Sequence, residues 1–350
     1  MIKRIFTLVL VLMGIQMFGQ QEEQYTHYMF STTAYNPGYI GLQEAICLNG
    51  VHRQQWIGFQ DDEGNSINPV TTFFSVDLME YAIYGGLGLN FKQDELGAFT
   101  NTTVELGYSF HRNIGNGKLG IGIMGGLVDQ TIDFGHFKPL DPNDPLLIGS
   151  GKEESAMAFD VKFGGYYRVP GHWYAGVSSS KLIESEVALG DDLANPNFSR
   201  HYYITGGYTY RLPHPDFVLE PSAMIKTDIA ATQYDITSLV WYRDRFYGGL
   251  TYRTTDAVSV LVGMKNLLGT GGGNFKQEGD MLGISYDLTT SALGAEGRSA
   301  GTVEIFLRYC FNIEIPDIPE GHGTVRFLRP REDAPRPAPE EDEDKDEDKD

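Results

Sequence analysis

The chain has 350 residues, and its 47 acidic side chains against 27 basic ones give a formal net charge of −20 at pH 7. This acidic balance excludes the basic surface that binding to nucleic acid requires. Aromatic residues make up 12% of the chain, a content that suits the aromatic girdles of a membrane β-barrel.

The first 19 residues have the features of a Sec signal peptide. Lys3 and Arg4 precede an apolar run from Ile5 to Phe18, and the small residue Gly19 follows it. This run is too short for a spanning helix, and no later stretch reaches the roughly twenty apolar residues that such a helix needs. We therefore predict that residues 1–19 are removed and that any membrane insertion of the mature chain uses strands.

Residues 20–43 come before the first predicted strand and form a segment of their own. The part from Gln24 to Gly41 is rich in Tyr and His, and Asn36-Pro37-Gly38 is a turn signal that ends local regularity. One interpretation is a plug inside the barrel. The other is a periplasmic lead-in that only covers the mouth of the barrel.

Residues 44–314 alternate between apolar and polar side chains over segments of about ten residues, separated by Gly, Pro, Asn or Asp. In the last segment, Ile305 and Leu307 share one face while Glu304 and Arg308 share the other with Phe306. This repetition predicts an all-β protein, an antiparallel transmembrane outer-membrane β-barrel. The predicted strands are 44–56, 70–79, 84–92, 99–112, 117–130, 155–168, 172–180, 200–212, 217–228, 232–243, 246–255, 257–265, 280–289 and 302–313.

Fourteen is an even number, so the first and last strands should begin and end on one side of the barrel. Tight connectors follow several even-numbered strands, and they lie at Asn113 to Asn116, Val169 to Gly171, Pro213 to Pro215 and Asp244. The long connectors Ile132 to Glu154 and Lys181 to Ser199 follow strands five and seven. Because barrels place short turns in the periplasm, we expect periplasmic N- and C-termini. The Gly-rich connector Leu267 to Gly279 is an exception and suggests a miscount nearby.

The two cysteines, Cys47 and Cys310, fall in the first and last strands, which are antiparallel neighbours in a closed barrel. Alternation places both on the lumen side at a similar height. A disulfide between these strands is one hypothesis for an oxidising compartment. The alternative is two unlinked small hydrophobic residues, because a register offset of one pair would exceed bridging distance.

Motifs for chemistry are weak. Gly115, Gly117 and Gly120 spell a GxGxxG, but they lie in a hairpin without the helix N-terminus that would bind a phosphate. The eight histidines are scattered, without HExxH or a cluster of metal-binding spacing. Asp141, Asn143 and Asp144 could attract calcium, yet the prolines between them favour a surface loop. We expect no enzyme activity, no metal and no cofactor.

Residues 315–350 form a Pro-rich acidic tail. Residues 331–350 hold eleven acids and four bases, a net charge of −7, and such a composition cannot fold alone. The tail is interpreted either as a periplasmic tether for a basic partner or as a solvated extension.

Several motifs resemble those of one family. The run Gln24 to Phe30, the run Ala34 to Tyr39 and the run Arg53 to Phe59 are similar to the N-terminal signature of PorP/SprF proteins, outer-membrane proteins of Bacteroidetes. Later landmarks that also resemble the family are Phe159-Asp160, Gly164 to Tyr167, Tyr234-Asp235, Gly248 to Arg253, Ser285 to Leu288, Arg308 to Phe311 and Val325 to Leu328. The likeness ends after Leu328.

The resemblance implies a barrel of the type IX secretion system, tied to export or surface attachment of proteins with a C-terminal sorting domain, including gliding adhesins, and no catalysis. An anchor of this kind would bind its secreted partner through the long connectors. The candidate contact residues there are Phe134, Phe137, Leu146, Leu147, Asp191, Asp192 and Phe198. An apolar residue among them could instead pack against the barrel rim.

The alternative function is a passive or substrate-selective pore for small or hydrophobic solutes. It predicts conductance or uptake and no obligate protein partner. The predicted lumen faces are rich in Thr, Gly and Tyr without a dense ring of charge, which argues against an ion-selective porin.

Overall fold

The computed structural model describes residues 22–60, 64, 66–80, 83–136, 153–183, 199–254, 256–267, 279–291 and 299–311. The signal peptide and the acidic tail predicted from the sequence lie outside these residues. Three short 3-10 helices, η1 (Thr32–Ala34), η2 (Pro37–Tyr39) and η4 (Phe134–His136), accompany the strands. No helix within the described part of the chain is long and apolar enough to cross a membrane.

The described residues form fifteen strands in one antiparallel sheet. They are β1 (Ile46–Gln54), β2 (Val70–Glu80), β3 (Gly85–Leu96), β4 (Phe99–Ile114), β5 (Gly117–Asp133), β6 (Glu153–Val169), β7 (Trp173–Ser180), β8 (His201–Tyr208), β9 (Tyr210–Arg211), β10 (Phe217–Thr227), β11 (Thr232–Tyr242), β12 (Phe246–Arg253), β13 (Ala257–Lys265), β14 (Met281–Thr289) and β15 (Thr302–Phe311).

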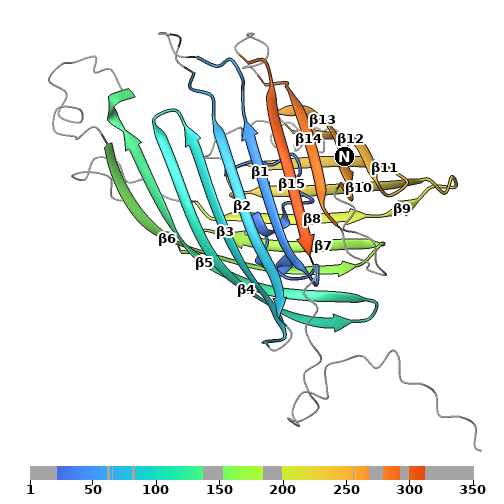
Figure 1. Ribbon diagram of the computed structural model, residues 1–350. Coiled ribbons are helices and arrows are strands. Elements are labelled where there is room, and N and C mark those ends of the chain that lie inside the picture. The colour runs from blue at the N-terminus through green and yellow to red at the C-terminus, as the bar shows by residue number, and fades with distance from the viewer. Residues whose placement is uncertain are drawn as a thin grey trace, which may run out of the picture. The chain divides into compact units, whose positions relative to one another are not determined.

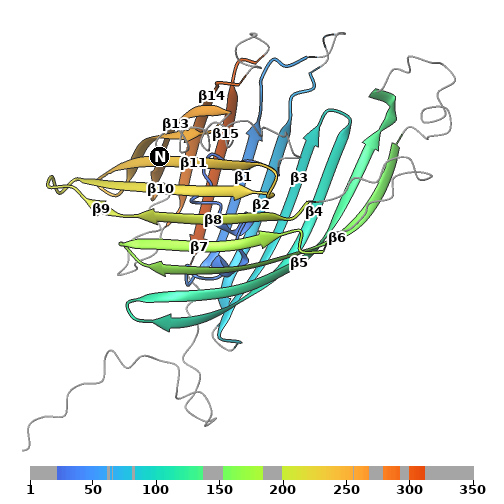
Figure 2. The same cartoon turned by 180° about the vertical axis from the view of Figure 1, so that it is seen from behind.

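The sheet closes on itself as a barrel, because β1 pairs with β15 and β10 pairs with β11 (Figures 1 and 2). The short strand β9 continues β8 in the same register on β10, since Gly207 pairs with Ser222 and Tyr210 pairs with Leu219. Between these pairs, Tyr208 and Thr209 stand opposite Pro221 and Glu220, and Pro221 has no N–H to donate to a ladder. The barrel therefore has fourteen strands and the one short extra strand β9, and the predicted fold class and strand count are confirmed.

Alternation decides which side chains line the lumen. On β15, Glu304, Phe306 and Arg308 are buried, while Ile305 and Leu307 are exposed. On β11 every second residue is buried along the whole strand. The exposed apolar side chains include Leu106, Ile123, Phe163, Ile236, Leu250 and Ile284, from strands distributed around the barrel. An outer face this apolar is stable against lipid and costly against water.

The two ends of the barrel differ in their connections. At one end β1, β3, β5, β7, β10, β12 and β14 finish and β2, β4, β6, β8, β11, β13 and β15 begin, and we call it the loop end. At the other end β1, β3, β5, β7, β10, β12 and β14 begin and β2, β4, β6, β9, β11, β13 and β15 finish, and we call it the turn end. The long Gly-rich connector that follows β13 joins β13 to β14 at the turn end, because Lys265 at the end of β13 pairs with Met281 at the start of β14. The suspected miscount there is wrong.

The first strand begins and the last strand finishes at the turn end, and the two pair along their whole length. Their register runs from Ile46 opposite Phe311 to Gln54 opposite Val303, and it places Cys47 directly opposite Cys310. The two sulfurs are joined in a disulfide, and the Cα atoms are 4.1 Å apart. The offset that would have left two free thiols is absent, since the strands pair residue for residue.

Candidate functional site: the filled lumen

Residues 22–43 lie inside the ring of strands, and we call them the plug. All of residues 24–43 are buried except Met29 and Ala34, which are half-buried. Figures 1 and 2 show this dark blue segment between β1 to β5 on one side and β7 to β10 on the other. The segment therefore fills the lumen and does not merely cover a mouth of the barrel.

The turn signal in the sequence shapes the middle of the plug. Asn36 caps η2, since its Oδ1 accepts a hydrogen bond from the Gly38 N–H at 2.9 Å, and Pro37 starts the helix with its fixed φ. The Nδ2 atom of Asn36 donates to the carbonyls of Gly165 and Val177 at 3.0 and 3.4 Å. One side chain thus fixes the local turn and attaches it to β6 and β7.

An ionic cluster attaches the plug to the strands near the loop end. Glu304 on β15 accepts hydrogen bonds from the backbone N–H groups of Thr26 and His27 at 2.7 and 2.8 Å, and from His27 Nδ1 at 2.7 Å. Arg53 on β1 contacts Glu304 at 3.2 Å and Asp287 on β14 at 2.7 Å. The Thr26 hydroxyl lies 3.0 Å from both carboxylate oxygens of Asp287. All these groups are buried, so each charge is stabilised by its partners and not by water.

Two more arginines extend the attachment to plug carbonyls. Arg253, at the loop end of β12, pairs with Asp235 at 3.3 Å and Asp287 at 3.4 Å and donates to the carbonyl of Tyr25. Arg308 donates to the carbonyl of Phe30, and its Nε donates to Asn49 at 2.8 Å. Charge-assisted bonds to main-chain carbonyls hold the backbone of the plug as well as its side chains.

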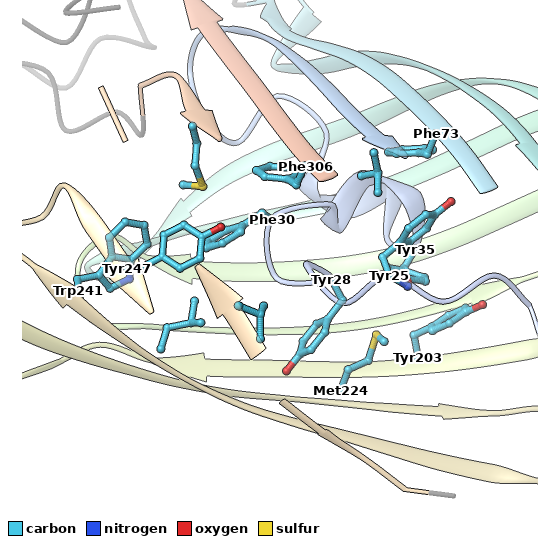
Figure 3. Packing of buried hydrophobic residues seen from close by; sticks show 14 of the residues in the cluster. Tyr25, Tyr28, Phe30, Tyr35, Phe73, Tyr203, Met224, Trp241, Tyr247 and Phe306 are labelled. Carbon is cyan, nitrogen blue, oxygen red and sulfur yellow. The ribbon is translucent and has the colours of Figure 1, made fainter. Parts of the chain in front are cut away.

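Aromatic packing surrounds this cluster. Tyr25, Tyr28, Phe30 and Tyr35 of the plug contact side chains from distant strands in one buried cluster. Figure 3 shows them with Phe73, Tyr203, Met224, Trp241, Tyr247 and Phe306 of the wall. The ring of Phe30 lies 5.6 Å from Phe306 and 5.7 Å from Tyr247, within the range of favourable edge and tilted contacts. The lumen thus has a hydrophobic core to which the plug contributes about half of the labelled rings.

Glycines in β3 to β7 let the plug backbone lie directly on the wall. A Cβ at Gly120 would stand 2.1 Å from the carbonyl of Gly38, and a Cβ at Gly122 would stand 2.2 Å from that of Pro37. A Cβ at Gly86 would likewise stand 2.5 Å from the carbonyl of Ile40. Side chains at these positions would push the plug away from the strands.

A buried pair of opposite charges lies on the same side. Lys162 on β6 and Glu105 on β4 are 2.8 Å apart, and Lys162 also donates to the carbonyl of Ala34 at 3.2 Å. Asn90 on β3 donates to the carbonyl of Thr33 at 3.0 Å. The lumen therefore holds buried charged pairs in addition to the Thr, Gly and Tyr side chains expected there. Glu105 and Lys162 lie on β4 and β6, which both pair with β5, so pairing of neighbouring strands brings the two charges together.

The plug crosses the lumen from one end of the barrel to the other. Glu22 accepts from Ser180, the last residue of β7, at 3.0 Å and lies 3.5 Å from Lys181. Glu44 pairs with Lys118 beside the turn between β4 and β5. The start of β1 and the end of β15 lie at the same end of the barrel, as the even strand count predicts. Glu22, at the start of the plug, lies at the opposite end.

Lysines set the ionisation of the two acids that begin the plug. Burial alone would raise the pKa of Glu22, but Lys181, His201 and Lys92 outweigh it and hold that pKa well below its ordinary value of 4.5. Burial opposes the charged form of Glu23 in the same way, and Lys92, at 2.8 Å, again lowers the pKa.

Among the predicted contact residues, Phe134 is half-buried against Ile132 and Ala158, together with Phe99 and Ala156. It packs on its own barrel rim, which is the alternative that the sequence left open. The other candidates, Phe137, Leu146, Leu147, Asp191, Asp192 and Phe198, lie outside the described residues.

The weaker motifs have structural explanations. Gly115 lies in the two-residue turn between β4 and β5, with a positive φ of 57°, and Gly120 is one of the wall glycines. Within the described residues no group of three His, Cys, Asp or Glu side chains could bind a metal ion. The calcium candidates Asp141, Asn143 and Asp144 lie outside those residues.

A closed β-barrel with an apolar outer face and a lumen filled by its own N-terminal segment is a membrane barrel. The family model of type IX secretion system membrane protein PorP/SprF matches residues 17–309, and the chain belongs to this family. It is therefore a type IX secretion component of the outer membrane. Its family and fold are those of a secretion-system barrel and not of an enzyme.

Solved structures similar to the chain are themselves barrels of low identity. The Ralstonia pickettii toluene transporter TbuX has 11% identity and a TM-score of 0.45, over 85% of this chain and 96% of that chain. The Acinetobacter baumannii outer membrane protein Omp33 has 5% identity and a TM-score of 0.40, over 77% and 100%. A TodX monoaromatic hydrocarbon channel mutant has 10% identity and a TM-score of 0.39, over 77% and 89%. No protein of curated function matches the chain.

Proposed function

We propose that this protein is a non-enzymatic accessory or anchor subunit of the type IX secretion system. In this role it binds a secreted or surface adhesin-type protein through that protein's C-terminal sorting domain and links it to the secretion or gliding machinery. The observation that carries the proposal is the filled lumen in a barrel of this family. A barrel whose interior is occupied along its length offers its ends to other proteins, and not a path to solutes.

The attachment of the plug supports an anchor over a pore. Hydrogen bonds and ion pairs reach the plug from β1, β3, β4, β6, β12, β14 and β15. A cavity beside Glu22, Tyr25 and Lys92 has a volume of about 10 Å³, room for a single water molecule. A second cavity, of about 210 Å³, lies at the turn end beside Asp280, Met281 and Arg308. Because the plug is attached along its length between these two cavities, we expect the barrel to conduct neither ions nor solutes at a measurable rate.

The partner surface in this proposal is the loop end, on the extracellular side, and the turn end faces the periplasm. The long connections 134–152 and 181–200 carry the candidate residues Phe137, Leu146, Leu147, Asp191, Asp192 and Phe198. Phe134 supports the base of the first connection by packing on Ile132. In this proposal the acidic tail, residues 315–350, is periplasmic and meets the secretion machinery.

The test is affinity purification of the tagged barrel from native outer membrane in mild detergent, followed by mass spectrometry. We expect a large protein with a C-terminal sorting domain together with secretion or motility components. The double variant Asp191→Asn, Asp192→Asn should lose the client, while the turn-end variant Asp244→Asn should keep it. A barrel that purifies alone and conducts in planar bilayers would overturn the anchor and support the pore.

A further inference from the structure

The plug begins at the loop end of the barrel. Its first described residues contact side chains at the loop end: Glu22 meets Ser180 and Lys181, and its carbonyl accepts from Lys226 at 2.9 Å. Lys226 is the second-last residue of β10, immediately before the loop-end connection 228–231. Gln24 bonds Gln233, the second residue of β11, at 3.0 Å.

Successive contacts then descend along the barrel. Phe30 meets Arg308 and Thr33 meets Ser75, both in the middle of their strands. Ile40 and Gly41 meet His111 and Asp77, close to the turn end of β4 and β2. The order of contacts is the order of the sequence, so the plug runs one way and does not fold back.

We propose that the amino terminus of the mature chain lies at the loop end of the barrel, opposite the turn end where β1 begins and β15 finishes. Cleavage after Gly19 leaves only Gln20 and Gln21 before Glu22. Two residues reach at most about 7 Å. The eleven residues of β10 rise about 36 Å along the strand, and tilt shortens this to roughly 27 Å along the barrel axis. Two residues cannot return the terminus to the turn end.

Lysine contacts hold Glu22 and Glu23, at the start of the plug, at the loop end. Lys92, Lys181 and Lys226 approach the two acidic residues from three separate strands or strand ends, and Glu22 and Glu23 are both largely buried. Lys92 pairs with Glu23, Lys181 pairs with Glu22, and Lys226 donates to the Glu22 carbonyl, so the first two described residues are attached to β3, the end of β7 and β10. The plug therefore begins at the loop end of the barrel.

A second step rests on the proposed function. If the loop end binds the sorting domain of a secreted protein, the amino terminus lies within the area that this protein covers.

Cysteine labelling of intact cells tests the first step. Gln21→Cys is compared with Ile229→Cys, an exposed loop-end position, and with Asn116→Cys in a tight turn, each with the native disulfide retained. A membrane-impermeant maleimide should label positions 21 and 229 in intact cells and position 116 only after the outer membrane is permeabilised. Position 21 behaving like position 116, or staying unreactive in intact cells that lack the secreted partner, overturns the inference.

The comparison separates this inference from the orientation of the barrel. If 229 were labelled only after permeabilisation and 116 in intact cells, the barrel orientation in the proposed function would be wrong. Position 21 would still have to follow position 229. A photo-crosslinking amino acid at Gln21 tests the second step: a cross-link to the co-purified secreted protein supports it, and labelling without any cross-link overturns only that step.

Discussion

Arg53 of β1 and Glu304 of β15 are register partners across the junction of the first and last strands, and both bind Thr26 of the plug. The guanidinium donates to Glu304 at 3.2 Å and to the Thr26 hydroxyl at 2.8 Å. Closure of the barrel and attachment of the plug therefore use the same side chains.

Glu304→Gln should destabilise the barrel by about 3 kcal/mol, because it removes the negative charge that Arg53 and His27 contact in a buried site. Urea unfolding in detergent micelles measures this loss. The matched control is Asp216→Asn, whose partner Arg243 lies 3.3 Å away on the exposed turn end and should matter by less than about 1 kcal/mol. Equal effects from the two variants would refute a special role for the cluster.

The wall glycines predict a difference between two neighbours on β6. A Cβ at Gly164 would stand 2.3 Å from Asn36 Oδ1, whereas one at Gly165 would meet its nearest atom at 3.9 Å. We expect Gly164→Ala to cost about 1 to 3 kcal/mol through displacement of the plug, and Gly165→Ala to cost little. Hydrogen exchange of residues 36–41 should rise in the first variant alone. No difference between them would mean that the plug does not rest on this wall.

The strands could be predicted from the sequence because alternation is a local property. Glu304 and Phe306 already show their lumen face against Ile305 and Leu307, without knowledge of any other strand. The cluster could not be predicted in the same way. Arg53 lies on the first strand, 234 and 251 residues before Asp287 and Glu304 on the last two strands, and their meeting depends on the register at closure.

The plug shows the same limit. Asn36-Pro37-Gly38 predicts a turn, but the glycines that receive it, such as Gly120 and Gly164, resemble ordinary strand or hairpin glycines until the wall is assembled. One sequence signal could have indicated where the plug contacts the wall. Gly120 and Gly122 are two residues apart, so both lie on the lumen face of the same strand. For Phe134 the sequence allows either contact with a partner or packing on the barrel rim, and only the positions of Ile132 and Ala158 in the folded barrel decide between them.

The disulfide between Cys47 and Cys310 should leave no thiol open to alkylation before reduction, and Cys47→Ser should expose one thiol at Cys310. It closes a loop across 263 residues of sequence separation, which by chain entropy corresponds to up to ~5 kcal/mol of stability. Reduction should therefore lower the urea midpoint of the wild-type barrel and leave that of the double variant Cys47→Ser, Cys310→Ser unchanged. Two alkylatable thiols in unreduced native membranes would contradict the bond.

Acid should release the loop end of the plug before its turn end. The pKa values of Glu22 and Glu23 are held below their ordinary value of 4.5 in the folded protein, so their contribution is complete above that value and is lost as the pH falls through the lowered pKa. Hydrogen exchange, corrected for intrinsic rates, should increase at residues 22–28 between pH 5 and pH 2. Residues 36–43 should change less, because carbonyl and amide contacts fix most of them.

The double variant Glu22→Gln, Glu23→Gln should give the same release at neutral pH, because it removes both carboxylates while the lysines Lys92 and Lys181 remain charged. The matched control is Glu95→Gln, on the same end of β3 and exposed to solvent. If the double variant exchanged no faster than this control at pH 7, the lysine contacts would not be what fixes the start of the plug, and the acid effect would have to come from carboxylates deeper in the lumen.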